Sequence, residues 1–222
     1  MYGTNLVIMN TDLVEYYKAR AAEYEKIYQK PERQVELAMA SKLLAELFAG
    51  QDILEIACGT GYWTERIAQT ARSIMATDIN EAVLAIAMQK EFPKDNVQFA
   101  VADIYSFKGI EQYQGVFGGF ILSHIEYQQT LNFINNVNRF VKPGGTVVLM
   151  DNIYVGGSSL PIAETDEEGN TYQLRTLENG TLHRVLKNFQ DEGFLRDMLT
   201  DSAGNVEYFD LKYYWVLKYT VA

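Results

Sequence analysis

The stretch DILEIACGTGYW, residues 52–63, joins an apolar, strand-like segment to a helical segment through five small residues, 57–61. Larger side chains would bury more surface at this corner, so the choice of small ones suggests that another group occupies the space. Small residues let backbone N–H groups approach a ligand, and strand-to-helix turns of open α/β sheets border the ligand crevice. The alternative is a tight turn without a ligand.

The pattern around this stretch predicts one α/β domain. Five short apolar segments read as strands: 52–57, 73–78, 96–103, 115–124 and 146–151. Helical patterns begin between them near Tyr62, Glu81 and Gln129. Strands that alternate with helices indicate a doubly wound, mainly parallel sheet covered by helices on both faces. At 222 residues, one domain spanning 1–222 accounts for the chain.

Two further segments flank this pattern. Residues 11–50 read as an N-terminal helical lid, with one helix from 11 to 30, interrupted by Pro31, and a second over 32–49. Residues 152–188 read as an inserted hairpin with a two-residue turn at Asn179-Gly180. Because side chains alternate along strands, that turn predicts two faces. One carries Tyr172, His183, Val185 and Lys187, and the other carries Arg175 and Arg184.

Composition limits the classes of function. The formal net charge of −10 leaves no broad basic face for nucleic acid or an anionic membrane. One cysteine and two histidines argue against a disulfide and a metal site, and fit a cytoplasmic protein. No signal peptide and no apolar stretch of about 20 residues is evident. The sequence gives no indication of oligomeric state.

Acids at the strand ends point to a nucleoside-containing cofactor. Asp78 ends the second strand, where a carboxylate accepts hydrogen bonds from ribose, and Asp103 ends the third, near an adenine amino group. Either acid alone is more often a helix cap or turn residue. Thr64 replaces the third glycine of a dinucleotide fingerprint, and Glu55 would repel a pyrophosphate but suits a cationic amino-acid moiety. This combination points to S-adenosylmethionine.

LEIACGTG, TDIN, VADI and VKPGGTVVLMD together resemble the class I S-adenosylmethionine-dependent methyltransferases. The resemblance implies a Rossmann-like sheet of seven strands, the last antiparallel, with VEYFDLK and YYWVLKYTV as strands six and seven. It also implies that Gly59 and Gly61 pack under the cofactor, whose product form is S-adenosylhomocysteine, and that Glu55 faces its amino group. The other cofactor-binding residues of the core are expected to be Ala57, Thr60, Asp78, Ile79, Asp103 and Ile104.

The N-terminal segment and the end of the fourth strand are expected to border the acceptor. Tyr17, Tyr24 and Tyr28, at spacings of seven and four, share one helix face with Arg20 alongside. They form either a packing face or a lid in which the rings cover the sulfonium and Arg20 meets the cofactor carboxylate. His124 lies just past the fourth strand and is either structural or part of the acceptor site.

A narrower resemblance favours an anionic acceptor. EYYKARAAEY, GGFILSHI and RTLENGTLHRVLKNF are similar to segments of a bacterial subgroup that includes a phosphonate O-methyltransferase. The resemblance implies that His124, Arg175 and Lys187 lie near the acceptor, and with Tyr28 they are the candidate catalytic residues. A solvated, charged hairpin is the alternative. In the acceptor-binding role, Lys187→Ala would raise the KM for the acceptor.

We therefore expect methyl transfer to a small molecule, most naturally at an oxygen of a phosphonate or carboxylate. One alternative is N-methylation of a small amine, whose cation tyrosine hydroxyls and Glu126 would bind. Another is a module that binds the cofactor without catalysis.

Overall fold

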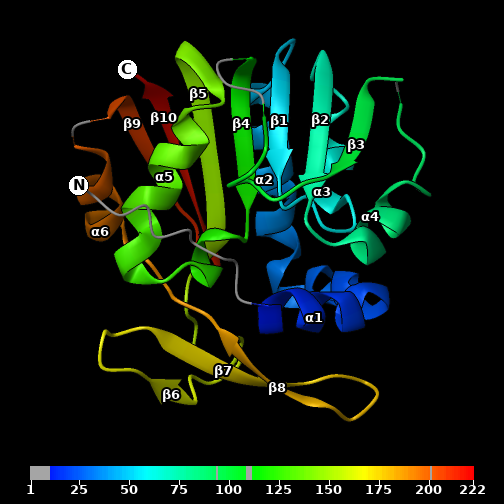
Figure 1. Ribbon diagram of the computed structural model, residues 1–222, viewed down its shortest axis with the longest axis vertical. Helices are drawn as coiled ribbons and strands as arrows, with labels where there is room; N and C mark the ends of the chain where they lie inside the picture. Colours follow the sequence, from blue (N-terminus) through cyan, green and yellow to red (C-terminus); the bar gives the residue numbers. More distant parts are fainter. Residues whose placement is uncertain (1–10, 94, 109–111, 201) are drawn as a thin grey trace.

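The computed structural model describes residues 11–93, 95–108, 112–200 and 202–222, so the first ten residues of the predicted domain lie outside it. A seven-stranded sheet of order β3-β2-β1-β4-β5-β10-β9 forms its centre (Figure 1). Its strands are β1 (Asp52–Ile56), β2 (Ser73–Asp78), β3 (Val97–Val101), β4 (Tyr113–Gly119), β5 (Val141–Asn152), β9 (Ala203–Asp210) and β10 (Tyr214–Val221). The first five are parallel, and β10 runs antiparallel to both neighbours. This confirms the predicted Rossmann-like methyltransferase fold.

Helices cover both faces of this sheet (Figure 1). They are α2 (Gln34–Leu47), α3 (Tyr62–Ile67), α4 (Glu81–Ala87), α5 (Thr130–Asn138) and α6 (Glu192–Leu199). Because strand side chains alternate, Ile53 packs into the apolar cluster shared with α2 and α3, whereas Leu54 packs into the cluster shared with α5 and α6. None of the described helices combines the length and apolarity needed to cross a bilayer.

The N-terminal segment lies across the carboxyl ends of the parallel strands (Figure 1). It contains α1 (Thr11–Arg20) and two 3₁₀ helices, η1 (Ala21–Gln29) and η2 (Pro31–Arg33). The predicted helical segment is therefore present to Gln29, but its winding changes from α to 3₁₀ after Arg20. In the tighter winding, Tyr28 is buried and stacks on Tyr62 at 3.7 Å between ring centroids. Packing against the body of the protein outweighs the local preference for an α-helix.

A second, three-stranded sheet lies beyond α1 (Figure 1). Its strands are β6 (Glu164–Thr165), β7 (Thr171–Thr176) and β8 (Leu182–Leu186). The turn between β7 and β8 has three residues, because the N–H of Leu177 donates to the carbonyl of Thr181 at 3.0 Å. Gly180 supplies the left-handed residue of this turn with φ +84°. The predicted two-residue turn was therefore wrong.

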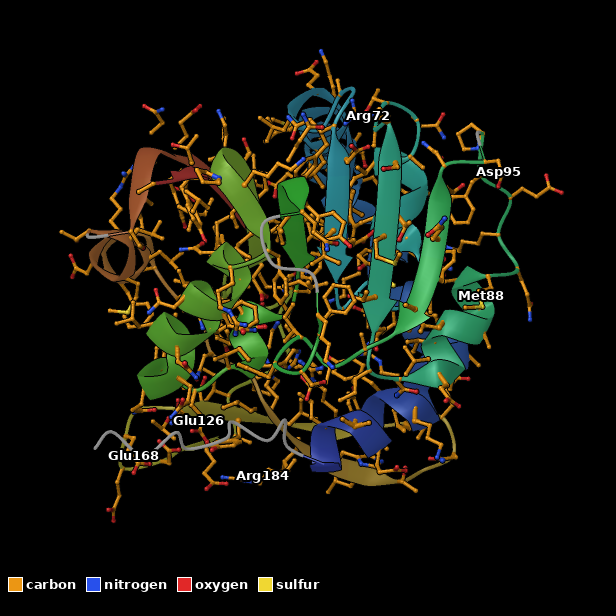
Figure 2. All side chains as sticks on the ribbon, turned by 45° about the horizontal axis from the view of Figure 1, so that its top comes forward. Arg72, Met88, Asp95, Glu126, Glu168 and Arg184 are labelled. Atoms are coloured by element: carbon orange, nitrogen blue, oxygen red, sulfur yellow. The ribbon has the colours of Figure 1, made fainter. Side chains whose placement is uncertain are left out.

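The extra turn residue changes which side chains share a face of the hairpin. Arg175 pairs directly with His183, so both lie on the face that also carries Lys187. Tyr172 moves to the opposite face, where the guanidinium of Arg184 lies 3.4 Å from the centroid of its ring. Figure 2 shows Arg184 at the outer side of the hairpin sheet, away from the central sheet. The predicted grouping of Arg175 with Arg184 was wrong for this reason.

Candidate active site

Two cavities meet at the carboxyl edge of the central sheet. The first, the strand-end cavity, lies between α1 and the ends of β1 to β4. The second, the basic cavity, lies between the N-terminal segment and the hairpin sheet. Both are lined by Tyr17, Tyr24, Phe120 and His124. These four side chains therefore form the junction of the cavities.

Most of the predicted cofactor-binding residues line the strand-end cavity: Tyr17, Tyr24, Ala57, Gly59, Asp78, Ile79, Asp103 and Ile104. Arg20 lines the basic cavity instead. Glu55, Thr60 and Gly61 line neither cavity. Eight of the twelve predicted cofactor-binding residues therefore line the strand-end cavity, and four do not.

The glycine turn provides space at one of its two glycines. A Cβ on Gly59 would meet only Tyr24, at 3.8 Å, so this position borders open space. A Cβ on Gly61 would lie 3.1 Å from the Cβ of Ala87, so this glycine lets α4 pack against the turn. Ala57, which stands at the family's first glycine, keeps the left-handed conformation with φ 52°.

The strand-end acids are oriented by backbone donors. Asp78 accepts hydrogen bonds from the N–H groups of Gly59 and Asn80, both at 2.9 Å. Asp103 accepts one from the N–H of Tyr105 at 2.9 Å. Burial raises the pKa of Asp78, and these donors oppose the shift. Each carboxylate still has lone pairs available for a ligand on the cavity side.

Hydrogen bonds attach the N-terminal segment to the cavity floor. The hydroxyl of Thr60 and the ammonium of Lys90 both donate to Glu25 Oε1 in η1, at 2.7 and 2.5 Å. The side-chain amide of Asn80 donates to the carbonyl of Val14 at 3.0 Å. Thr60 therefore holds the segment in place rather than lining the cavity.

Glu55 is a buried carboxyl whose Oε2 has no hydrogen-bond partner among the described residues. Burial raises its pKa to about 8, and the charge of Asp78 adds to the shift. An unsatisfied carboxyl oxygen beside the glycine turn fits a cationic group such as the amino group of S-adenosylmethionine. Asp78 and Asp103 therefore give the strand-end cavity acceptors that suit the cofactor's adenosine, whereas Glu55 lines neither cavity and becomes a negative charge near the turn only where a neighbouring cation lowers its pKa.

Glu55→Gln is expected to stabilise the ligand-free protein at pH 8 and to weaken cofactor binding about tenfold through the lost charge. The unfolded chain loses this proton above about pH 4.5, whereas the folded protein keeps it until about pH 8, so folded-state stability falls across that interval. Thermal melts should show a gain of several degrees at pH 8 that vanishes near pH 4. A Tm difference independent of pH would contradict the assigned pKa.

Tyr17 and His124 close the junction between the cavities. The Nδ1 of His124 lies 2.6 Å from the carbonyl oxygen of Leu186, so this nitrogen carries the proton and donates it. Its Nε2 then accepts a hydrogen bond from the Tyr17 hydroxyl at 2.7 Å. Burial, with the charges of Lys187 and Arg175, holds the pKa of His124 well below its usual range. The imidazole is therefore neutral at physiological pH.

Lys187 lines the basic cavity, but its charge is already compensated. Its ammonium donates to Asp151 Oδ1 at 3.0 Å and to Ser123 Oγ at 2.5 Å. Both members of the ion pair are buried, and burial lowers the pKa of Lys187 to about 8. The structure therefore favours a structural role for Lys187, as the buried partner of Asp151, over direct binding of the acceptor.

Lys187→Met is accordingly expected to lower the free energy of unfolding by roughly 3–5 kcal/mol, since it leaves Asp151 buried without its partner. Urea unfolding should show part of this loss recovered in the double variant Lys187→Met/Asp151→Asn. A single variant as stable as the wild type would show that the pair does not contribute to stability. Because Lys187 also supports the fold, a higher KM for the acceptor in Lys187→Ala would not by itself show that Lys187 binds the acceptor.

Arg175 and Tyr28 differ in their access to the acceptor side. Arg175 lines the basic cavity, and its guanidinium donates to Gln173 Oε1 at 2.9 and 3.2 Å without a carboxylate partner among the described residues. Tyr28 lines neither cavity. Its hydroxyl accepts from the Trp63 indole N–H at 3.2 Å inside an aromatic cluster. Tyr28 thus acts on the junction through packing, since its ring contacts Phe120, with 6.1 Å between the ring centroids.

Several residues of the site were not identified from the sequence. Phe120 has a left-handed backbone with φ 61°, and its N–H donates to the Met150 carbonyl at 2.7 Å, which fixes its ring at the junction. The segment FGGF, with two glycines before this position, was the available signal. Lys30 and Arg33 line the basic cavity through contacts with Ser158, more than 100 residues away, which local patterns do not reveal.

Comparisons with known proteins agree with this geometry. A family profile described as a methyltransferase domain matches residues 53–145. The malonyl-[acyl-carrier protein] O-methyltransferase 2 of Ilyobacter polytropus is 29% identical over 99 residues, covering 44% of this chain and 38% of that protein. A ubiquinone biosynthesis O-methyltransferase of Pseudomonas aeruginosa is 31% identical over 105 residues, covering 46% and 44%. The chain spans less than half the length of these two curated relatives.

A solved structure matches nearly the whole chain. The complex of DhpI with SAM and HEP superposes with a TM-score of 0.75 at 26% identity, covering 98% of this chain and 99% of DhpI. DhpI with SAH gives a TM-score of 0.74 at the same identity, covering 96% of each chain. The likeness therefore includes the N-terminal segment and the hairpin insertion as well as the central sheet.

Proposed function

We propose that this chain, which resembles DhpI over nearly its whole length, is a class I S-adenosylmethionine-dependent methyltransferase that methylates an oxygen of a small anionic metabolite. The acceptor is a phosphonate or a carboxylate held in the basic cavity. The observation that carries the proposal is the charge of this cavity. Arg20, Arg33 and Arg175 line it without carboxylate partners among the described residues, in a chain of net charge −10.

The residues at the junction suit an acceptor that is already ionised. When bound, S-adenosylmethionine supplies an electrophilic methyl group, and an anionic oxygen attacks it without losing a proton. A general base works best with a pKa near the operating pH, whereas the pKa of His124 is depressed. His124 and Tyr17 instead orient the acceptor and exclude water, while Arg175 and Arg20 bind spectator oxygens.

N-methylation of an amine receives less support. Of the described residues that line the basic cavity, Glu23 alone carries a carboxylate, and it also accepts the N–H of Glu178 at 3.3 Å. Glu126 is exposed and lines neither cavity (Figure 2). A substrate cation would therefore meet mostly positive charge.

Transfer of labelled methyl groups from S-adenosylmethionine to methylphosphonate, propionate and ethanolamine tests the proposal. We expect methyl esters of the two acids and no methylated amine. Methylation of ethanolamine alone would replace the proposal with the amine alternative.

A further inference from the structure

The basic cavity has a second group of cations besides the one at the junction. Arg20 and Arg175 surround Tyr16, with their guanidinium carbons 5.7 and 5.8 Å from its ring centroid. Lys30 and Arg33 line the same cavity at a different position, where both contact Ser158 and Arg33 also lies over the rings of Tyr213 and Tyr214. The cavity therefore offers positive charge at two positions.

Arg33 is a buried cation with neutral partners. The residue is 6% exposed, and its guanidinium lies over the ring of Tyr213, at 5.1 Å from the centroid. Its guanidinium donates to Ser158 Oγ at 3.0 and 3.2 Å and approaches Asn152 Oδ1 at 3.4 Å. Among the described residues no carboxylate lies within ion-pair distance of it. A nearby acid, Glu32, is exposed and reaches Arg33 only through the Ser158 hydroxyl, so the buried guanidinium has no direct ion pair and a ligand anion would stabilise it.

Lys30 adds a second positive charge at the same place. Its ammonium donates to the carbonyl of Ser158 at 2.5 Å. Burial lowers the pKa of Lys30, and the charge of Arg33 lowers it further. The nearby acid, Glu32, is exposed and accepts a hydrogen bond from the Ser158 hydroxyl at 2.9 Å. Two neighbouring cations with mainly neutral partners form a position that an anionic group would stabilise.

We propose that Lys30 and Arg33 bind a second anionic group of the acceptor, at the end away from the oxygen that receives the methyl group. This inference rests on the proposed function. The acceptor class is thereby narrowed to small metabolites with two anionic groups, such as a phosphonate that also carries a carboxylate. Arg20 and Arg175 hold the anionic group of the acceptor that is methylated. Lys30 and Arg33 select acceptors by the charge of their second group and by its distance from the first.

Two acceptors of nearly equal shape test the inference: phosphonoacetate and its neutral amide, carbamoylmethylphosphonate. The wild type should show a kcat/KM about tenfold or more higher for phosphonoacetate, the size of one charge-assisted contact. In Lys30→Gln the ratio of the two kcat/KM values should fall towards one. Lys26→Gln is the matched control, because Lys26 lines the same cavity but is exposed and paired with Glu178. Its ratio should equal that of the wild type.

An equal kcat/KM for both acceptors in the wild type, or an unchanged ratio in Lys30→Gln, would overturn the inference and leave the cations a purely structural role in holding the Ser158 loop. Calorimetry on the protein saturated with S-adenosylhomocysteine covers the case in which neither acceptor is methylated. Tighter binding of phosphonoacetate that depends on Lys30 would then support the second anion position while the proposed function fails. Equal binding of the two compounds would overturn the inference.

Discussion

Asp78→Ala is expected to weaken the binding of S-adenosylhomocysteine at least about 100-fold. Asp78 is aimed into the strand-end cavity by the N–H groups of Gly59 and Asn80. Alanine would remove an acceptor for ribose hydroxyls and leave these two donors without their carboxylate. Charge-assisted hydrogen bonds contribute about 1.5–3 kcal/mol each, so the loss of two hydrogen bonds to the ribose corresponds to a factor of about 100 or more in affinity. Calorimetric titration of the variant measures the change directly.

Asp197→Ala is the control for this prediction, because Asp197 is exposed on α6, away from both cavities. Its affinity should match that of the wild type. Thermal melts without ligand establish that each variant is folded. A folded Asp78→Ala protein with affinity within twofold of the wild type would remove Asp78 from the cofactor site.

Arg175→Met is expected to lower kcat/KM for an anionic acceptor about 10- to 100-fold, while the affinity for S-adenosylhomocysteine stays within twofold. Arg175 presents a guanidinium to the basic cavity without a carboxylate partner among the described residues. Removing one charge-assisted contact to the acceptor accounts for this range. Methyl-transfer kinetics with methylphosphonate and calorimetry with the cofactor product separate the two effects.

Arg184→Met provides a matched comparison from the same hairpin. Arg184 lies on the opposite face and forms an exposed ion pair with Glu164 at 2.8 Å, which contributes little to stability. Its kinetics should equal those of the wild type. Comparable losses in the two variants would show that long-range charge, rather than a contact from Arg175, governs acceptor binding.

Local signals in the sequence were sufficient for the central sheet and the strand-end cavity. Strands alternating with helices specify the parallel sheet, and parallel strands bring Asp78 and Asp103 to the same edge. The small residues of the turn mark the space beside them. Regular secondary structure links sequence spacing to spatial position here, so the residues at this edge could be placed from the sequence, and their roles in cofactor binding stay a prediction.

The acceptor side depended on features that spacing does not encode. A single additional turn residue moved Arg175 to the face of His183, since side chains alternate at every position. Lys187 was predicted to lie near the acceptor, but folding pairs its ammonium with Asp151, 36 positions away. Such pairings follow from tertiary packing, which no local pattern of the sequence reports.

A crystal structure with S-adenosylhomocysteine and methylphosphonate bound tests the central claim most directly. The account predicts adenosine in the strand-end cavity beside Asp78 and Asp103, and phosphonate oxygens within hydrogen-bond distance of Arg175, with the Tyr17–His124 pair at the side of the contact between the two molecules. Phosphonate bound outside the basic cavity, while the cofactor product occupies the strand-end cavity, would contradict it.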